Sequence, residues 1–240
     1  MQITIKADLH VHTLASGHAY STVDEVAQTA SKKGLKLVAI TNHGPAMPGA
    51  SHRYYFGNMR IIPDKLYGVR LLSGVEANIL NDGSLDLDDN MLERLDFVTA
   101  GIHRDAGYSN KTRKQHTQAI ITAIKHPLVK MITHPANTAF APNLEEIVRT
   151  AGEYNVILEA NASSFYNFRI GKRGDYKMST HMCKLAREYD VPISLNSDAH
   201  FHTEVGDITF LNEVIEKSGL EERNVINSSE KRILDFLKIK

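Results

Sequence analysis

The 240-residue chain has no tryptophan and a single cysteine, Cys183. One cysteine excludes an intrachain disulfide, which agrees with a reducing compartment. Its position beside Met182 and Leu185 in a helical pattern favours a small buried hydrophobic residue over a nucleophile. No apolar run approaches the roughly 18 to 20 residues of a membrane span, and no signal peptide opens the chain. The sequence therefore predicts a cytoplasmic protein that does not act at a membrane.

The chain also lacks an excess of charge of either sign, because 28 Lys and Arg balance 28 Asp and Glu. General nucleic-acid surfaces are usually basic, and an aromatic content of 7% gives little support for base stacking. We therefore expect no nucleic-acid partner, although a small positive pocket for one phosphate stays possible. The 42% of hydrophobic residues is enough for a sizeable buried core.

Apolar runs alternate with helical periodicity along nearly the whole chain. About seven runs predict strands, at residues 3–9, 35–40, 70–75, 95–100, 129–133, 156–160 and 192–195. Helices are predicted between them, one of which Ser21 or Thr22 can cap, and Asn143 with Glu146 resembles a second capping pair. This βαβα order implies parallel strands joined by right-handed crossovers, either in a doubly wound sheet or in a closed barrel.

Nine acidic or imidazole side chains stand at the C-terminal ends of these predicted strands or in the loops that follow. They are His10, His12, His18, His43, Glu76, His103, His134, Asp198 and His200. Residues i and i+2 of a strand share a face, so His10 and His12 can point at one cation. The candidates follow at least five different strands. A barrel gathers residues from nearly every strand end, whereas an open sheet gathers them at one crevice, so an α/β barrel is favoured.

Imidazole and carboxylate ligands suit zinc, manganese and iron better than magnesium or calcium. Nine ligands exceed the four of one tetrahedral zinc and fit two or three metals that share a carboxylate. Three other histidines, His116, His126 and His181, fall in or beside predicted helices and are interpreted as surface or structural residues. The stretch 43–69 lacks periodicity and is interpreted as a long excursion over the strand ends, a candidate lid.

Several short blocks carry a resemblance to a known family. They are Asp-Leu-His-Val-His-Thr at 8–13, Thr-Asn-His-Gly at 41–44, Gly-Val-Glu-Ala-Asn at 74–78, Gly-Ile-His at 101–103, Thr-His-Pro at 133–135 and Asn-Ser-Asp-Ala-His at 196–200. In this order they resemble the PHP family, which includes histidinol phosphatases and domains of bacterial DNA polymerases. The spacing of His10, His12 and His18, with Asn58-Met59-Arg60, is most similar to the single-domain bacterial phosphatase branch.

That resemblance implies one domain over residues 1–240, a distorted TIM-like (β/α)7 barrel and a trinuclear site for divalent metals, zinc before manganese or iron. It assigns His10, His12, Glu76 and Asp198 to the first metal, Glu76, His103 and His134 to the second, and His18, His43 and His200 to the third. The family often has aspartate where this chain has Asn42. Asparagine can orient an imidazole only as a neutral acceptor, a departure that concerns the third metal.

The expected function is a metal-dependent phosphatase for small phosphorylated substrates. A metal-bridging hydroxide would attack phosphorus, with Glu76 and Asp198 central to catalysis, and a third metal would offset the charge that builds up. Arg169, in the loop after the sixth strand, is the favoured residue for orienting the phosphate, ahead of Lys172 and Arg173, because arginine can donate two parallel hydrogen bonds. Arg53 and Arg60 are weaker candidates.

Other functions fit the same residues. The enzyme could be a histidinol phosphatase, or a phosphodiesterase or nuclease acting at the same site. A related amidohydrolase is ranked lower, because Glu76 supplies the bridging ligand for which such enzymes often use a lysine. The non-enzyme alternative is a metal-binding PHP module, which would be expected to have lost ligands. Natural substrate and oligomeric state stay open.

Overall fold

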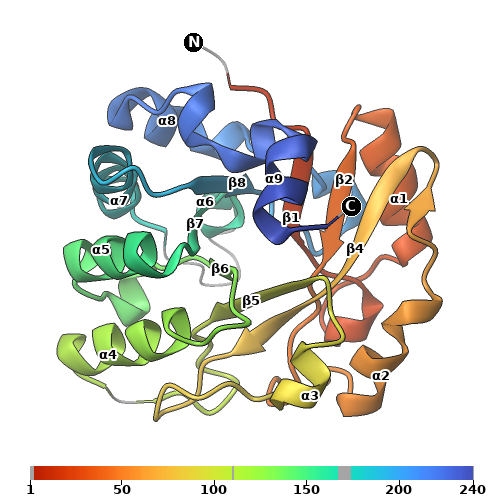
Figure 1. The fold of residues 1–240 in the computed structure, drawn as a ribbon, viewed down its shortest axis with the longest axis horizontal. Helices are drawn as coiled ribbons and strands as arrows, with labels where there is room; N and C mark the ends of the chain where they lie inside the picture. The colour runs from red at the N-terminus through yellow and green to blue at the C-terminus, as the bar shows by residue number, and fades with distance from the viewer. Residues whose placement is uncertain (1–2, 110, 167–173, 240) are drawn as a thin grey trace.

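The strands of the computed structural model form one sheet that curls almost into a barrel (Figure 1). The structure describes residues 3–109, 111–166 and 174–239. Seven parallel strands follow in the order β1, β2, β4, β5, β6, β7 and β8, and the short β3 pairs antiparallel with β4. Their bounds are Ala7–Val11, Leu37–Ile40, Val69–Asn78, Phe97–Gly101, Met131–Ile132, Ile157–Asn161 and Ile193–Asn196, with β3 at Lys65–Leu66. This is the α/β barrel with seven parallel strands that was predicted.

The barrel is distorted where its last strand returns to its first. No continuous ladder joins β8 to β1 in the described chain; instead, a single bridge links Val11 to Ala199. There the backbone N–H of His12 donates to the carbonyl of Ala199 at 2.9 Å. Lower in the seam, the N–H of Leu9 donates to the side-chain oxygen Oδ1 of Asn196 at 3.1 Å. A side chain therefore replaces backbone pairing at this seam.

The helices lie outside the sheet, and α4, α5 and α7 are stacked along one side of it in Figure 1. The helix bounds are α1 Val23–Lys32, α2 Arg53–Asn58, α3 Asp89–Leu92, α4 Arg113–Ile124, α5 Leu144–Tyr154, α6 Ser163–Tyr166, α7 Tyr176–Glu188, α8 Asn212–Ser218 and α9 Glu230–Leu237. Thr22 and Glu25 form a complete capping box on α1, as predicted. Asn143 is the N-cap residue of α5, but its side chain donates to Glu146 and makes no capping bond to the backbone. Among the described residues, no helix combines the length and the apolar character needed to span a bilayer.

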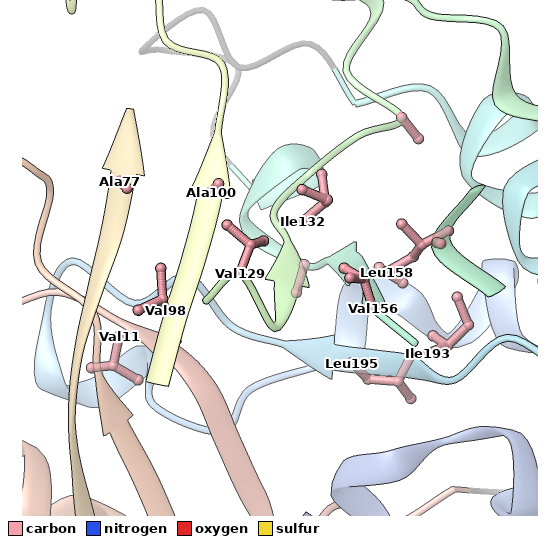
Figure 2. Close-up of a cluster of buried hydrophobic side chains, with 14 of the residues drawn as sticks. Val11, Ala77, Val98, Ala100, Val129, Ile132, Val156, Leu158, Ile193 and Leu195 are labelled. Atoms are coloured by element: carbon pink, nitrogen blue, oxygen red, sulfur yellow. The ribbon is translucent and has the colours of Figure 1, made fainter. Parts of the chain in front are cut away.

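Alternating strand residues build two apolar layers. The outer layer lies between the strands and the helices, and Figure 2 shows part of it, including Val98 and Ala100 of β5, Leu158 of β7 and Leu195 of β8. The inner layer contains Ala7, Leu9, Leu37, Ala39, Leu72, Phe97, Met131 and Ile157, together with Ile233 of α9. Because α9 packs on these inward residues, it closes the barrel at the N-terminal ends of the strands, opposite the predicted ligands.

Strand β1 contains a β-bulge just before the first pair of histidines. Asp8 pairs with Val38 and Val11 pairs with Ile40, so two residues of β1 face one residue of β2. Leu9 belongs to the inner layer, whereas Val11 belongs to the outer one. The bulge therefore shifts the alternation by one residue and turns His10 and His12 toward the barrel interior.

One expectation about local structure was wrong. The first strand runs from Ala7 to Val11 and not from residue 3 to 9, so His10 lies inside the strand. The stretch 43–69, which lacks a clear hydrophobic period, contains α2, a 3-10 turn at Met59–Ile61 and β3. These elements are too short to produce a readable hydrophobic period.

Candidate metal centre

The structure brings the predicted ligands together at the C-terminal ends of the strands. His10 and Glu76 lie within β1 and β4, and the others lie in the loops just after β1, β2, β5, β6 and β8. His10, His12, His43, Glu76 and Asp198 are buried, whereas His103, His134 and His200 are partly exposed. Residues from most of the barrel thus share one small space, as parallel strand ends allow.

The Glu76 carboxylate lies at the middle of this cluster. Its Oε2 faces three ring nitrogens, at 3.3 Å from Nε2 of His10, 3.4 Å from Nε2 of His12 and 3.0 Å from Nδ1 of His43. Its Oε1 faces two others, at 3.3 Å from Nε2 of His103 and 3.0 Å from Nε2 of His134. One carboxylate therefore presents each oxygen to a different set of imidazoles, which is the arrangement a ligand shared by two metals requires.

Asp198 joins the first of these sets. Its Oδ1 lies 3.2 Å from Nε2 of His12 and 3.6 Å from Nε2 of His10. Its backbone has a φ of +53°, in the left-handed region that non-glycine residues rarely occupy. Such strain persists only where the surrounding structure imposes it, and here it turns the carboxylate toward the cluster.

The third predicted group is less closely gathered. Ligand atoms of His12, His43 and His200 all lie within 4.8 Å of one another. The exposed ring of His18 lies 5.0 Å, centroid to centroid, from the rings of both His43 and His200. The resemblance assigned His12 to the first metal and His43 to the third. In the structure, His12 also lies beside His43 and His200, and His43 also faces Glu76, so these two histidines lie between the two groups.

Four imidazoles are oriented by a partner on Nδ1. These pairs are His10 with Oε1 of Glu159 at 2.8 Å, His12 with Oγ of Ser16 at 2.9 Å, His103 with Oδ1 of Asn78 at 2.8 Å, and His200 with the carbonyl of Asp198 at 3.0 Å. An acceptor on Nδ1 keeps the proton there and leaves the lone pair of Nε2 free. Histidines that bind metals commonly have such an acceptor on the other nitrogen.

Two buried atoms of the cluster make no hydrogen bond with the described residues, namely Oε2 of Glu76 and Nδ1 of His43. Leaving such atoms unpaired is costly. In addition, the Nε2 atoms of His10 and His12 are 3.0 Å apart, and those of His103 and His134 are 3.2 Å apart. Ligand nitrogens about 2.0–2.1 Å from a tetrahedral zinc would be roughly 3.3 Å apart. The residues therefore fit metal ions in both places.

The titration behaviour of the cluster is divided. Burial would lower the pKa of His10, but Glu159, Glu76 and Asp198 raise it well above its usual value, so this ring must release a proton when it binds a cation. Burial lowers the pKa of His12 well below its usual value and that of His43 to about 3, so both rings are neutral with a lone pair to donate. Burial alone would raise the pKa of Glu76, but the imidazoles of His10, His103 and His43 lower it well below its ordinary value. Neutral imidazoles and an ionised carboxylate are the forms that bind a cation.

Comparison with known proteins identifies the family. The sequence model of the PHP domain matches residues 8–163. The chain belongs to the PHP family. A protein of Syntrophotalea carbinolica named probable phosphatase is 39% identical over 239 residues, 99% of this chain and 98% of that protein. A protein of Thermoanaerobacter with the same name is 42% identical over 234 residues, 97% of this chain and 94% of its own length.

A solved structure shares the PHP fold. The crystal structure of histidinol phosphate phosphatase from Lactococcus lactis, complexed with zinc, L-histidinol and phosphate, superposes with a TM-score of 0.63. It is 17% identical in sequence, and the match covers 91% of this chain and 95% of that one. At this identity, the likeness shows the common barrel.

The PHP centre of this chain also contains a carboxylate that the sequence analysis missed, Glu159 of β7. It is fully buried and accepts hydrogen bonds from four donors. They are Nδ1 of His10 at 2.8 Å, Nδ2 of Asn196 at 2.9 Å, the backbone N–H of His134 at 2.8 Å and Nδ2 of Asn161 at 3.0 Å. The sequence did contain a signal for Glu159, because a charged residue inside the apolar run 156–160 needs buried polar partners.

Asn42 also contributes, but it acts on the first group of ligands, whereas its departure from the family pattern was expected to concern the third metal. Its Oδ1 accepts from Oγ of Ser16 at 2.8 Å, and Ser16 in turn bonds Nδ1 of His12 at 2.9 Å. Its Nδ2 donates to the hydroxyl of Tyr55 at 2.8 Å. Asn42 is therefore the neutral acceptor that was expected, but it orients His12 of the first group.

A cavity of about 510 Å³ opens beside the cluster. Besides metal-ligand candidates, its wall contains the apolar Met47, Pro48, Ile102 and Phe140 and the polar Arg104, Asp105, Asn137 and Ser164. Arg169, Lys172 and Arg173 lie outside the described residues. Arg53 pairs with Asp88 on the surface, and neither it nor Arg60 lines the cavity. From the predicted lid, His43, Met47 and Pro48 contribute to the wall.

Proposed function

We propose that this PHP protein is a metal-dependent phosphatase that hydrolyses small phosphomonoesters. The observation that carries the proposal is the Glu76 carboxylate, whose two oxygens face separate sets of imidazoles beside a cavity. Proteins named probable phosphatase align with almost the whole chain, which supports the same activity for this protein.

In this proposal three divalent ions, zinc being the best fit, are held by the nine residues His10, His12, His18, His43, Glu76, His103, His134, Asp198 and His200. Such metals polarise a phosphate and lower the pKa of water toward neutrality, which supplies the nucleophile. The protein positions the ligands: Glu159, Ser16 and Asn78 fix the ring orientations, and Glu76 and Asp198 provide the negative charge that retains the ions.

Gly101 keeps the centre open. A Cβ atom at this position would lie 2.3 Å from Oγ1 of Thr133 and 3.0 Å from Oε1 of Glu76. Thr133 donates to that same Glu76 oxygen at 2.7 Å. A side chain at residue 101 would therefore displace the hydrogen bond that holds Glu76 in place.

The experiment is to purify the protein without chelators, measure its metals by mass spectrometry, and assay 4-nitrophenyl phosphate. We expect hydrolysis that is lost after dialysis against EDTA and restored by zinc or manganese. Bis(4-nitrophenyl) phosphate and L-histidinol phosphate are assayed beside it. Faster cleavage of the diester would indicate a phosphodiesterase, and a strong preference for histidinol phosphate would indicate the specialised enzyme. Bound metals without hydrolysis of any ester would contradict the proposal.

The cavity also indicates how substrate is held. Among the described residues that line it, Arg104 is the single lysine or arginine, and its neighbours Ile102 and Phe140 are apolar. Arg104 immediately follows His103, so its backbone is fixed close to the cluster. We propose that the Arg104 guanidinium binds an anionic group of the substrate while the apolar wall contacts its organic part.

Arg104→Gln is expected to raise KM for phenyl phosphate about 10- to 100-fold, since hydrogen bonds to charged groups are worth about 1.5–3 kcal/mol. Steady-state kinetics on metal-loaded protein would measure it, with kcat changing less than KM. Arg94→Gln is the matched control, because Arg94 is exposed and does not line the cavity. An unchanged KM would exclude Arg104 and leave Arg169 as the leading candidate.

A further inference from the structure

Behind His103, a chain of polar side chains leads away from the metal centre to the cavity wall. Oδ1 of Asn78 accepts from Nδ1 of His103 at 2.8 Å. The other end of the same amide, Nδ2, donates to Oδ2 of Asp86 at 2.6 Å and to the carbonyl of Gly44 at 3.1 Å. Asn78 is fully buried at the end of β4, and Asp86 is half-buried.

These contacts determine which way the Asn78 amide points. A carboxylate and a carbonyl can only accept hydrogen bonds, so Asp86 and Gly44 both require the NH₂ end of the amide. The oxygen end is then left for His103, which must carry its proton on Nδ1. The lone pair of His103 Nε2 consequently faces Oε1 of Glu76, at 3.3 Å. A flipped amide would place the proton on Nε2 and prevent that nitrogen from binding a cation.

Asp86 also holds the wall of the cavity. Its Oδ1 accepts from the backbone N–H of Asn78 at 2.8 Å, and its Oδ2 accepts from the N–H of Ala46 at 2.8 Å. Ala46 precedes Met47, which lines the cavity. This approach requires Gly44, because a Cβ there would lie 2.3 Å from Oδ1 of Asp86. The Asp86 carboxylate therefore contacts both Asn78, which supports the ligand His103, and the backbone of Ala46, in segment 44–48.

We propose that Asp86 is a positioning residue for the metal centre: acting through Asn78, it keeps the proton of His103 on Nδ1 and so keeps Nε2 available to a cation. The kinetic consequence rests on the proposed function. The consequence for metal binding does not, because it concerns the affinity of the protein for zinc whatever reaction follows.

The test is Asp86→Asn. In the new side chain, an NH₂ group takes the place of Oδ1 or of Oδ2. In the place of Oδ2 it opposes the donors Nδ2 of Asn78 and N–H of Ala46, and only the Gly44 carbonyl then still favours the native orientation of the Asn78 amide. We expect zinc at the His103 position to bind about 10- to 100-fold more weakly. Metal-free protein would be titrated with zinc in competition with a chromogenic chelator, and ¹⁵N NMR of labelled histidines would report the His103 tautomer directly.

The matched control is Asp96→Asn. Asp96 accepts from the N–H and the hydroxyl of Ser73, farther back along the same strand β4, and does not contact the cluster. It should leave zinc affinity and the His103 tautomer unchanged. Wild-type zinc affinity and an Nδ1-protonated His103 in Asp86→Asn would overturn the proposal.

A second variant guards against simple misfolding. In Asn78→Asp combined with Asp86→Asn, residue 78 accepts from His103 as a carboxylate, and residue 86 donates to it. The exchange restores an acceptor on Nδ1, so the double variant should recover at least part of the lost zinc affinity. A double variant that carries the His103 proton on Nδ1 by ¹⁵N NMR, yet binds zinc no better than Asp86→Asn, would overturn the proposal. If zinc affinity follows the prediction but no ester is hydrolysed, only the proposed function fails.

Discussion

Replacing Glu76 with glutamine is expected to lower phosphatase activity by a factor of about 10³ or more and to remove bound metal. The amide has the shape of the carboxylate but lacks its charge, and its NH₂ end cannot serve as a ligand. Because one oxygen faces His10, His12 and His43 and the other faces His103 and His134, the loss affects both sets. Few other single substitutions in this chain would weaken the binding of two metals at once.

The measurements are metal content, kcat/KM and the melting temperature with and without zinc. The imidazoles that lower the pKa of Glu76 also stabilise its charge in the metal-free fold, so the metal-free variant should melt somewhat below the metal-free wild type. Zinc should then raise the melting temperature of the wild type much more than that of the variant. Glu93→Gln, at an exposed glutamate, is the control. Full activity with a normal metal content in Glu76→Gln would contradict the mechanism.

The cluster of ligands could be predicted from the sequence because each ligand is marked by the residues immediately beside it in the chain. Each apolar run marks a strand, and the residue that ends the run marks one edge of the barrel. His10 and His12 illustrate this well, since their i, i+2 spacing holds although the strand begins later than expected. The β-bulge that turns them inward depends on pairing with β2, which the sequence of β1 does not reveal.

The residues that orient the ligands could not be predicted in the same way. Asn78 supports His103 from the end of β4, and Asp86 supports it from the loop that follows. Ser16 and Asn42 support His12 through side-chain contacts that follow no fixed spacing. Such partners become visible only when distant segments are placed together. The resemblance shared this limit, because it linked Asn42 to the third metal and named none of the carboxylates behind the ligands.

Glu159 is the most informative of these hidden residues, and Glu159→Gln is expected to weaken both metal binding and the fold. In the wild type, burial would raise the pKa of Glu159, but His10 lowers it below its usual value, so the group is a carboxylate. Its oxygens satisfy four donors, including Nδ1 of His10 and the N–H of His134. His134 has a φ of +33°, and this hydrogen bond helps to hold that strained backbone.

A glutamine at position 159 leaves one pair of donors facing an NH₂ group, whichever way it turns. If that group faces His10, the ring proton moves to Nε2 and the ligand is lost; if it faces His134, the left-handed turn loses its support. We expect about 3 kcal/mol of lost stability in the metal-free protein and about 10- to 100-fold weaker zinc binding. Urea unfolding and chelator competition would measure the two effects, with exposed Glu145→Gln as the control. Both substitutions should lower the stability of the metal-free fold, and Glu159→Gln should lower it more, because it also leaves a pair of hydrogen-bond donors without an acceptor. Equal unfolding free energies for metal-free Glu159→Gln and wild type would show that this carboxylate is not the support that its four hydrogen bonds indicate.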